Sequence, residues 1–423
     1  MERSGLLSYE NKLIAILGLT FGIVFLDRNA ASFLAPFIVQ DLHLTNTQVG
    51  LLAAVLSLSW AISGYVIGLT SDKTGSRKAY LVASVLVFSV ASFLSGLASS
   101  FLILLAARLL MGIAEGPVLP IAQSLIALES SPHRRGLNAG LMQNVASAIL
   151  GTTIAPIVLV ALANHYGWRS AFFIAGAPGL IMAVLVAKYL REPKISAPSR
   201  PASSEIATSR DVTLTQMLLT RNVTLCTVIA CLMVAWMVLG WTFLPLFYVS
   251  IRQFSTTQMS MLMGVMGICA AVCGFIVPAL SDKFGRKPIV ALFCFLGALT
   301  PLAAIYYSGP ITMLAALVFI GWSAAGTFPV FMATIPSETI SAKYLSTVIS
   351  MVMGVGEIVG GVAAPTFSGM LADRHGLVVP IAIQVVCALA AGVLALFLKE
   401  TAPAKVAAAD GSVQRATRHP AIG

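Results

Sequence analysis

The chain has 423 residues, of which 58% are hydrophobic and only 10% are charged. Soluble domains carry about 25% charged residues, so this composition excludes an ordinary soluble fold and indicates a polytopic membrane protein. The net charge of +10 does not indicate a nucleic-acid partner, because the basic residues lie in short loops between apolar runs. The distribution is better explained by membrane topology, because the cytoplasmic loops of membrane proteins carry an excess of Lys and Arg.

Apolar runs long enough to cross a bilayer follow one another along the chain, at about 20 residues for about 30 Å of hydrocarbon. They cover residues 12–39, 47–70, 79–98, 100–125, 136–163, 168–190, 219–249, 257–280, 288–307, 310–335, 344–371 and 377–398. We therefore predict an all-α membrane protein with twelve transmembrane helices, in six-helix bundles at residues 1–190 and 218–400. A polar linker at 191–217 joins the bundles, and the tail at 401–423 is predicted to be disordered.

Basic residues predict the orientation of these helices. Lys and Arg concentrate in the loops after the second, fourth, eighth and tenth spans, in the linker and in the tail, which we call the basic loops. The opposite loops contain chiefly Arg169, Arg252 and Arg374. Because cytoplasmic loops retain Lys and Arg, we predict that both termini are cytoplasmic.

An internal repeat relates the two halves. The stretch G-L-T-S-D-K-T-G-S-R-K at residues 68–78 recurs as P-A-L-S-D-K-F-G-R-K at residues 278–287, with Asp72 and Asp282 210 positions apart. A shift of 209 aligns further landmarks, which are Gly112 with Gly321, Pro120 with Pro329, Glu129 with Glu338, and Gly167 with Gly376. Duplicated six-helix units predict a substrate site between them near the bilayer midplane.

Several polar residues near the middle of the first and fourth spans break this repeat. Asp27, Arg28 and Asn29 are adjacent in the first span, whereas Arg108 and Glu115 lie seven residues apart in the fourth, about 10 Å apart on one helix face. Each charge at this depth costs about 2.5 to 3.5 kcal/mol. At the repeat shift the four charges meet only apolar residues, which are Met237, Val238, Leu317 and Ala324. The fold does not require these charges, so we interpret them as functional.

Their chemistry suggests a proton-coupled anion site. Arg28 stays charged and can bind a carboxylate bidentately, so it is the predicted substrate ligand. We expect Asp27 to pair with Arg28 when the site is empty; a permanent structural ion pair is the alternative. For Glu115, burial favours the protonated form and a nearby Arg108 favours the ionised form, so this carboxyl can load and release a proton.

Other candidates are less specific. Asn29 accompanies Arg28, and the amides of Gln143 and Asn144 in the fifth span either bind substrate or link helices. Glu357 in the eleventh span has no adjacent Arg; it is either a protonated partner of a neighbouring helix or part of the second half-site. Trp60 and Trp322 either line the cavity or pack against other helices. We expect no metal and no cofactor, since no cluster of metal-ligating residues is visible.

With these motifs the chain resembles the major facilitator superfamily over about residues 12–400. The resemblance implies transport by rocking of two halves, with a conformational latch in the repeated loops rather than a binding site there. The latch residues it implies are Gly68, Asp72, Lys73, Gly75, Arg77, Asp282, Lys283, Gly285 and Arg286. Ser76 departs from the pattern, because a basic residue usually stands there.

Within the superfamily, D-R-N at 27–29 and R-L-L-M-G-I-A-E-G-P at 108–117 resemble the anion:cation symporters, which take up sugar acids and other organic acids with protons. This resemblance implies proton coupling by Asp27 and Glu115, substrate binding by Arg28, and tuning of a neighbouring acid by Arg108. Trp60 replaces a substrate-contacting Tyr of that family, and Glu357 falls near a polar Asn. An aromatic or less oxygenated carboxylate is therefore favoured over a polyhydroxylated one.

The sequence thus predicts a monomeric secondary transporter of a bacterial inner membrane, importing a small organic anion with protons. A drug:proton antiporter is the alternative, although G-T-T-I-A-P at 151–156 lacks the trailing glycines typical of that class. A membrane enzyme or a transporter-derived sensor is disfavoured. No nucleophile with a base, no phosphate-binding G-x-x-x-x-G-K-[ST] and no apolar extra domain is visible.

Overall fold

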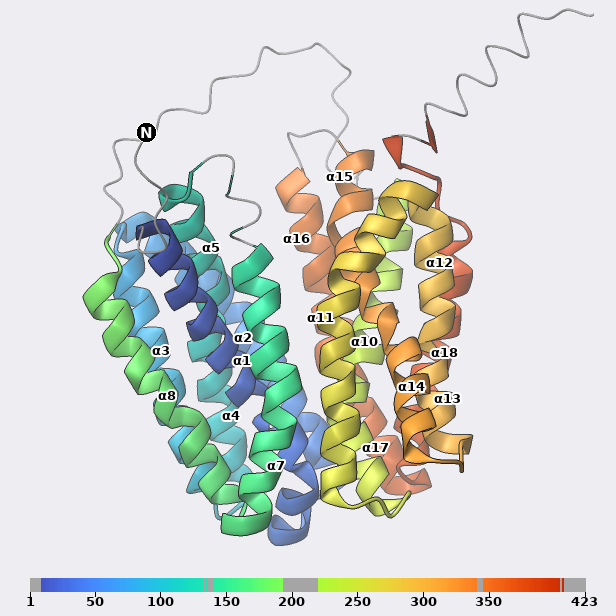
Figure 1. Ribbon diagram of the computed structural model, residues 1–423, viewed down its shortest axis with the longest axis horizontal. Helices are drawn as coiled ribbons and strands as arrows, with labels where there is room; N and C mark the ends of the chain where they lie inside the picture. Colours follow the sequence, from blue (N-terminus) through green and yellow to red (C-terminus); the bar gives the residue numbers. More distant parts are fainter. Residues whose placement is uncertain are drawn as a thin grey trace, which may run out of the picture. The chain divides into compact units, whose positions relative to one another are not determined.

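The computed structural model describes residues 9–131, 134, 138, 140–192, 220–340, 345–403, 405 and 406. Within these residues the chain forms helices joined by short turns (Figure 1). Among the described residues, twelve helical stretches are long and apolar enough to cross a membrane, which confirms the predicted fold class. Most of the predicted linker at 191–217 and tail at 401–423 lies outside the described residues.

In the first six spans, nine helical segments can be given bounds from the described residues. They are α1 (Tyr9–Leu42), α2 (Asn46–Thr74), α3 (Arg77–Gly96), α4 (Phe101–Glu115), α5 (Val118–Glu129), the π-helices η1 (Leu141–Val145) and η2 (Ser147–Ile154), α7 (Ala155–Tyr166) and α8 (Trp168–Tyr189). α4 and α5 form one span, as do η1, η2 and α7.

The last six spans are likewise divided into shorter helical segments. Their segments are α10 (Arg221–Ser250), α11 (Thr256–Phe284), α12 (Arg286–Gly297), α13 (Leu299–Tyr306), α14 (Ile311–Trp322), the 3₁₀-helix η3 (Ser323–Thr327), the π-helix η4 (Val330–Thr334), α15 (Ile335–Thr339), α16 (Leu345–Gly356), the π-helix η6 (Glu357–Ala363), α17 (Ala364–His375) and α18 (Val378–Ala395).

Proline explains where several spans leave the regular α-helix. Proline has no backbone N–H, so the carbonyl four residues earlier loses its helical partner. Pro117 lies at the break between α4 and α5, and Pro156 and Pro365 come directly after the π-helices η2 and η6. The two Ala-Pro pairs are 209 residues apart, so the repeat extends to this irregular geometry.

The repeat also appears in the way helices begin. Thr45 and Gln48 form a reciprocal capping box at the start of α2. Ser255 and Gln258 exchange the same two hydrogen bonds at the start of α11, 210 positions later. Each pair satisfies backbone N–H groups that a helix N-terminus leaves free. The match supports duplication of a common helical unit.

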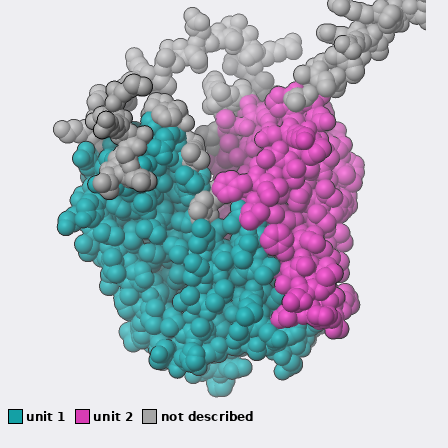
Figure 2. Space-filling view, in the orientation of Figure 1, with its two compact units in different colours: residues 1–211, 241–271, 365–379 teal, residues 212–240, 272–364, 380–423 magenta. Residues whose placement is uncertain are grey.

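Contacts divide the chain into two compact units (Figure 2). Unit 1 comprises residues 1–211, 241–271 and 365–379, and unit 2 comprises residues 212–240, 272–364 and 380–423. One end of α10 and of α11, and nearly all of α17, therefore pack in unit 1 with helices of the first half. The boundaries of these units differ from those of the two bundles predicted from the sequence, 1–190 and 218–400, which stay a prediction.

Candidate functional site

Arg28 of α1 and Glu115 of α4 form an ion pair within unit 1. Arg28 Nη1 lies 3.7 Å from Glu115 Oε2. The Glu115 side chain is completely buried, whereas 17% of the Arg28 side chain remains exposed. Neither carboxylate oxygen of Glu115 has a hydrogen-bond partner among the described residues. The pair therefore leaves donor and acceptor capacity unused on both sides.

Asp27, the neighbour of Arg28, points into the interior instead. Its Oδ1 accepts a hydrogen bond of 2.8 Å from Ser92 Oγ on α3, and its Oδ2 is buried without a described hydrogen-bond partner. Ser92 Oγ also lies 2.9 Å from the carbonyl oxygen of Phe172 on α8. One hydroxyl therefore links an acid of α1 to the backbone of α8.

Arg108 of α4 completes the group. It is fully buried and interacts electrostatically with Asp27 and Glu115. Its Nη1 donates to the carbonyl oxygen of Arg28 at 3.2 Å, and its guanidinium lies over the Phe172 ring at 5.3 Å. Two cations and two carboxyl groups thus meet in a buried cluster, which we call the charge cluster, formed by Asp27, Arg28, Arg108 and Glu115.

The pairing inside the charge cluster corrects our expectation. We expected Asp27 to be the partner of Arg28, but Glu115 takes that place and Asp27 interacts with Arg108. Consecutive residues of an α-helix point about 100° apart, so Asp27 and Arg28 cannot share a direction. Asp27 faces α3, and Arg28 faces α2 and α4. The charges of α1 and α4 therefore pair crosswise.

Close packing of α4 against α2 positions Glu115 and Trp60. A Cβ atom on Gly112 would lie 2.6 Å from the carbonyl oxygen of Leu56, which real side chains do not tolerate. Ser63 Oγ donates to the Gly112 carbonyl at 3.1 Å and ties the two helices together. The ring of Trp60, half-buried on α2, lies 5.1 Å from the Arg28 guanidinium carbon. Arg28 is thus held between an acid and an aromatic face.

Two polar candidates, Asn29 of the first span and Gln143 of the fifth, have partners on neighbouring helices. Asn29 Nδ2 donates to the carbonyl oxygen of Gly151 in η2 at 3.1 Å, which joins α1 to the fifth span. Gln143 Oε1 accepts a 2.8 Å hydrogen bond from Gln123 of α5. The Asn144 backbone lies in η1, and its side chain is outside the described residues. These contacts give Asn29 and Gln143 interhelical roles and leave substrate contact as a prediction.

The candidates of unit 2 differ in exposure. Trp322 is fully buried and stacks on Trp236, with ring centroids 4.4 Å apart. Its burial favours packing over contact with substrate. Glu357, the first residue of η6, is half-buried and forms no ion pair within the described part of the chain. Gln384 of α18, which the sequence did not single out, is completely buried with no described hydrogen-bond partner.

The repeated loops have well-defined local structure. Gly75 and Gly285 follow α2 and α11 with φ of 70° and 109°, values that favour glycine. Arg286 binds Asp282 and Glu338, which joins α11, α12 and α15 inside unit 2. Lys73 and Lys283 are exposed, Arg77 is half-buried, a Cβ on Gly68 would meet no atom, and the Asp72 side chain is not described. A latch between the halves remains a prediction.

Besides Gln384, sequence reasoning missed two groups. Ser92 belongs to a run of buried serines on α3, whose spacing of three residues was a readable signal: Ser89, Ser92 and Ser95. Asp373, near the end of α17, accepts hydrogen bonds from the backbone N–H groups of Asn46 and Thr47 at 2.7 and 2.9 Å. The repeat relates this contact to a second one, because Asn164, 209 positions earlier, accepts a hydrogen bond from Thr256 at the start of α11.

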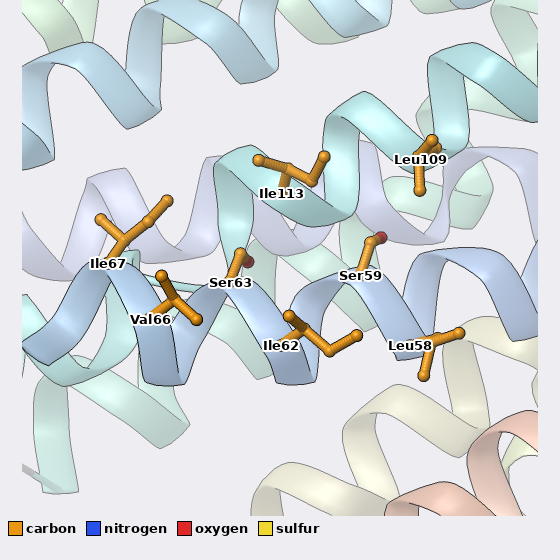
Figure 3. A pocket seen from close by; sticks show the side chains of 8 residues that line it. All are labelled: Leu58, Ser59, Ile62, Ser63, Val66, Ile67, Leu109 and Ile113. Carbon is orange, nitrogen blue, oxygen red and sulfur yellow. The ribbon is translucent and has the colours of Figure 1, made fainter.

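An apolar hollow of about 330 Å³ lies between α2 and α4 in unit 1 (Figure 3). Leu58, Ile62 and Val66 of α2 face Leu109 and Ile113 of α4 around it. Only the hydroxyls of two serines add polarity to this lining. The hollow therefore offers no charge that would hold an anion, and the charge cluster remains the candidate site.

Known proteins resemble the chain in sequence. Residues 17–363 and 241–421 match the family model described as the Major Facilitator Superfamily. The probable sulfoacetate transporter SauU of Cupriavidus necator is 28% identical over 183 residues, which are 43% of this chain and 42% of that protein. The hexuronate transporter of Bacillus subtilis is 32% identical over 186 residues, 43% of each chain. The quinolone resistance protein NorA of Staphylococcus aureus is 29% identical over 191 residues, 45% of this chain and 48% of NorA. Each match spans less than half of the relative.

Solved structures share the fold over most of the chain. A bacterial homologue of the human lysosomal transporter Spinster, inward-facing and occupied, gives a TM-score of 0.76 at 19% identity, over 92% of this chain and 96% of that one. A variant of the nucleoside transporter NupG gives a TM-score of 0.73 at 15% identity, over 92% and 100%. The family match, the twelve spans and this shared fold lead to one conclusion: the chain belongs to the major facilitator superfamily.

Proposed function

We propose that this protein is a secondary transporter, not an enzyme, and that it imports a small organic anion together with protons. The observation that carries the proposal is the Arg28–Glu115 pair. A partly exposed guanidinium stands 3.7 Å from a buried carboxylate, too far for a hydrogen bond. A substrate carboxylate that approaches Arg28 offers shorter, bidentate hydrogen bonds and displaces Glu115 as the partner.

Charge balance then couples the anion to protons. With both acids ionised, the two arginines neutralise the charge cluster. Each negative charge that a substrate adds requires one proton, because an unbalanced charge is costly inside a membrane protein. Glu115 takes this proton when substrate occupies Arg28, and Asp27 can accept a second one. A monoanion thus travels with one proton and a dianion with two.

The relatives support an anionic substrate. Two of the relatives are named as transporters of sulfoacetate and hexuronate, and both of these compounds carry an acidic group beside other polar atoms. This agrees with membership in the anion:cation symporter family. Here the indole of Trp60 lies beside Arg28, so we propose an aromatic or sparsely hydroxylated carboxylate as the substrate.

Topology completes the proposal. The distribution of Lys and Arg supports cytoplasmic termini in a bacterial inner membrane. In this proposal the chain transports its substrate as a monomer. The contacts of Asp373 with the start of α2 lie at the end opposite the basic loops. We interpret them as a closed extracellular gate that must open to admit substrate.

A drug:proton antiporter is the second candidate, favoured by the similarity to NorA. Proteoliposome transport separates the two functions. With an inward proton gradient and a panel of aromatic acids, sugar acids and short dicarboxylates, we expect one anion to accumulate and a protonophore to abolish its accumulation. Proton-driven extrusion of lipophilic cations, with no anion accumulated, would overturn the proposal.

A further inference from the structure

Ser92 stands between an acid of the charge cluster and the backbone of another helix. Its Oγ lies 2.8 Å from Asp27 Oδ1 and 2.9 Å from the carbonyl oxygen of Phe172. A serine hydroxyl has one hydrogen to donate. A carbonyl oxygen and an ionised carboxylate only accept hydrogen bonds, so Ser92 cannot donate to both of them at once.

The proton on Asp27 decides which acceptor Ser92 serves. When Asp27 is ionised, Ser92 donates to Oδ1 in a charge-assisted hydrogen bond. When a proton enters and binds Oδ1, the new O–H group donates to Ser92 Oγ, and the Ser92 hydrogen turns to the Phe172 carbonyl. Once bound, the proton stays on Asp27, and only the Ser92 hydroxyl rotates. The link between α3 and α8 is therefore present in one protonation state and absent in the other.

We infer that Ser92 is a positioning residue for proton coupling, which reports the protonation of Asp27 to α8 through the Phe172 carbonyl. This inference rests on the proposed proton-coupled function. Phe172 contributes a second contact, because its ring lies under the guanidinium of Arg108. Loss or gain of the hydrogen bond from Ser92 to the Phe172 carbonyl thus acts on Phe172, the residue that packs against Arg108.

The surroundings leave few other ionisable groups near Asp27. From α4, Arg108 and Glu115 interact with it, and Arg28 is its neighbour on α1. The π-helices η1 and η2 contain no ionisable side chain. The remaining charged or titratable residues of the packed helices lie near helix ends: Arg77, Lys78 and Tyr80 of α3, Glu129 of α5, His165 and Tyr166 of α7, and Arg169, Lys188 and Tyr189 of α8.

Neighbouring serines provide matched controls. Ser89 and Ser95 are also completely buried on α3, but their hydroxyls donate to carbonyl oxygens of their own helix, Val85 and Ala91. Ser89→Ala and Ser95→Ala each remove a buried hydroxyl without touching an acid. Ser92→Ala removes the hydroxyl that serves Asp27, and all three substitutions shrink the side chain.

The test is the pH dependence of uptake in proteoliposomes. In Ser92→Ala an ionised Asp27 loses its hydrogen bond, and a bond to an ion is worth more than one to a neutral group, so the profile should move to higher pH by about one unit. Net uptake should fall while counterflow exchange persists, and Ser92→Cys, with a weaker donor, should give an intermediate shift. Ser89→Ala and Ser95→Ala should keep the original profile.

A second readout does not depend on transport. The carbonyl stretch of protonated Asp27, identified by its loss in Asp27→Asn, can be titrated by infrared difference spectroscopy in purified protein. An unchanged titration and pH profile in Ser92→Ala, or equal shifts in all three alanine variants, overturns the inference. If wild-type protein drives no anion uptake but the Ser92→Ala titration moves, the proposed function fails and the Ser92–Asp27 link stands.

Discussion

Arg28 and Glu115 belong to different helices, yet Arg28 Nη1 lies 3.7 Å from Glu115 Oε2. Adjacent in sequence to Arg28, Asp27 turns away toward Ser92 and interacts with Arg108. Each acid therefore faces the arginine of the other helix. This crosswise pairing couples α1 to α4, so a proton or a substrate at one helix changes the electrostatic balance at the other.

Arg28→Ala should abolish uptake. It removes the proposed substrate-binding cation, and truncation of one partner of a buried charge pair costs about 2 to 5 kcal/mol in binding, which corresponds to a loss of about 30-fold or more in affinity. Arg28→Lys keeps the charge without the bidentate geometry, so binding should weaken less. Thermal-shift titration with the transported anion measures both. Lys12→Ala, at an exposed position of the same helix, is the control. Wild-type uptake by Arg28→Ala contradicts the substrate assignment.

Glu115→Gln should separate exchange from accumulation. The amide resembles a permanently protonated carboxyl, so substrate can still occupy Arg28, but no proton is released at this position. We expect counterflow exchange to persist and proton-driven accumulation to fall to the equilibrium level. Glu357→Gln is the comparison for an acid outside the charge cluster, and a loss of substrate affinity in that variant would place Glu357 in the second half-site. Concentrative uptake by Glu115→Gln removes the proposed proton role.

Trp60 and Trp322 should respond differently to truncation. Trp60→Ala removes the ring beside Arg28, a cation–π contact worth about 0.5 to 2 kcal/mol, so the KM for uptake should rise about 2- to 30-fold. Trp60→Phe should restore most of the affinity. Trp322→Ala opens a hole beside Trp236, with a loss of about 3 to 5 kcal/mol in stability and a lower melting temperature. A raised KM with unchanged stability in Trp322→Ala would instead place that ring in the substrate path.

The sequence predicts much of this fold, because span positions follow from apolar length alone. The third span, expected at 79–98, is α3 at Arg77–Gly96, and the eighth, expected at 257–280, lies within α11. Breaks at Pro117 and π-helices before Pro156 and Pro365 were not anticipated. They depend on how neighbouring helices accommodate a missing hydrogen bond, and the hydrophobic pattern carries no information about that.

The charge cluster was predictable in membership but not in pairing. Buried charges are costly, so Asp27, Arg28, Arg108 and Glu115 stand out in any apolar span. Their partners depend on the rotation of α1 relative to α3 and α4, which a one-dimensional pattern does not specify. For Ser92 the sequence holds only a partial signal. The three-residue spacing of Ser89, Ser92 and Ser95 indicates a closely packed helix face, where serine is common, and only the position of Asp27 distinguishes Ser92 from the other two.

Asp373 and Thr47 should separate in every transport cycle. Asp373 accepts hydrogen bonds from the first N–H groups of α2 and from the Thr47 hydroxyl, so it acts as an added cap for that helix. Loss of a helix cap costs about 0.5 to 2 kcal/mol. Asp373→Asn keeps the shape but weakens these bonds, and it should therefore favour the state in which this end is open.

Cross-linking tests whether that opening is required. In the double variant Thr47→Cys and Asp373→Cys, oxidation should join α2 to α17 and stop uptake, and a reductant should restore it, because alternating access requires this end to open for each substrate. The single variants, treated with the same oxidant, control for pairing with the native cysteines, of which Cys226, Cys269, Cys273, Cys294 and Cys387 are buried. Uptake at an unchanged rate by fully cross-linked protein would show that α2 and α17 stay together throughout the cycle, and substrate would then have to enter by a route that leaves the Asp373 contact closed.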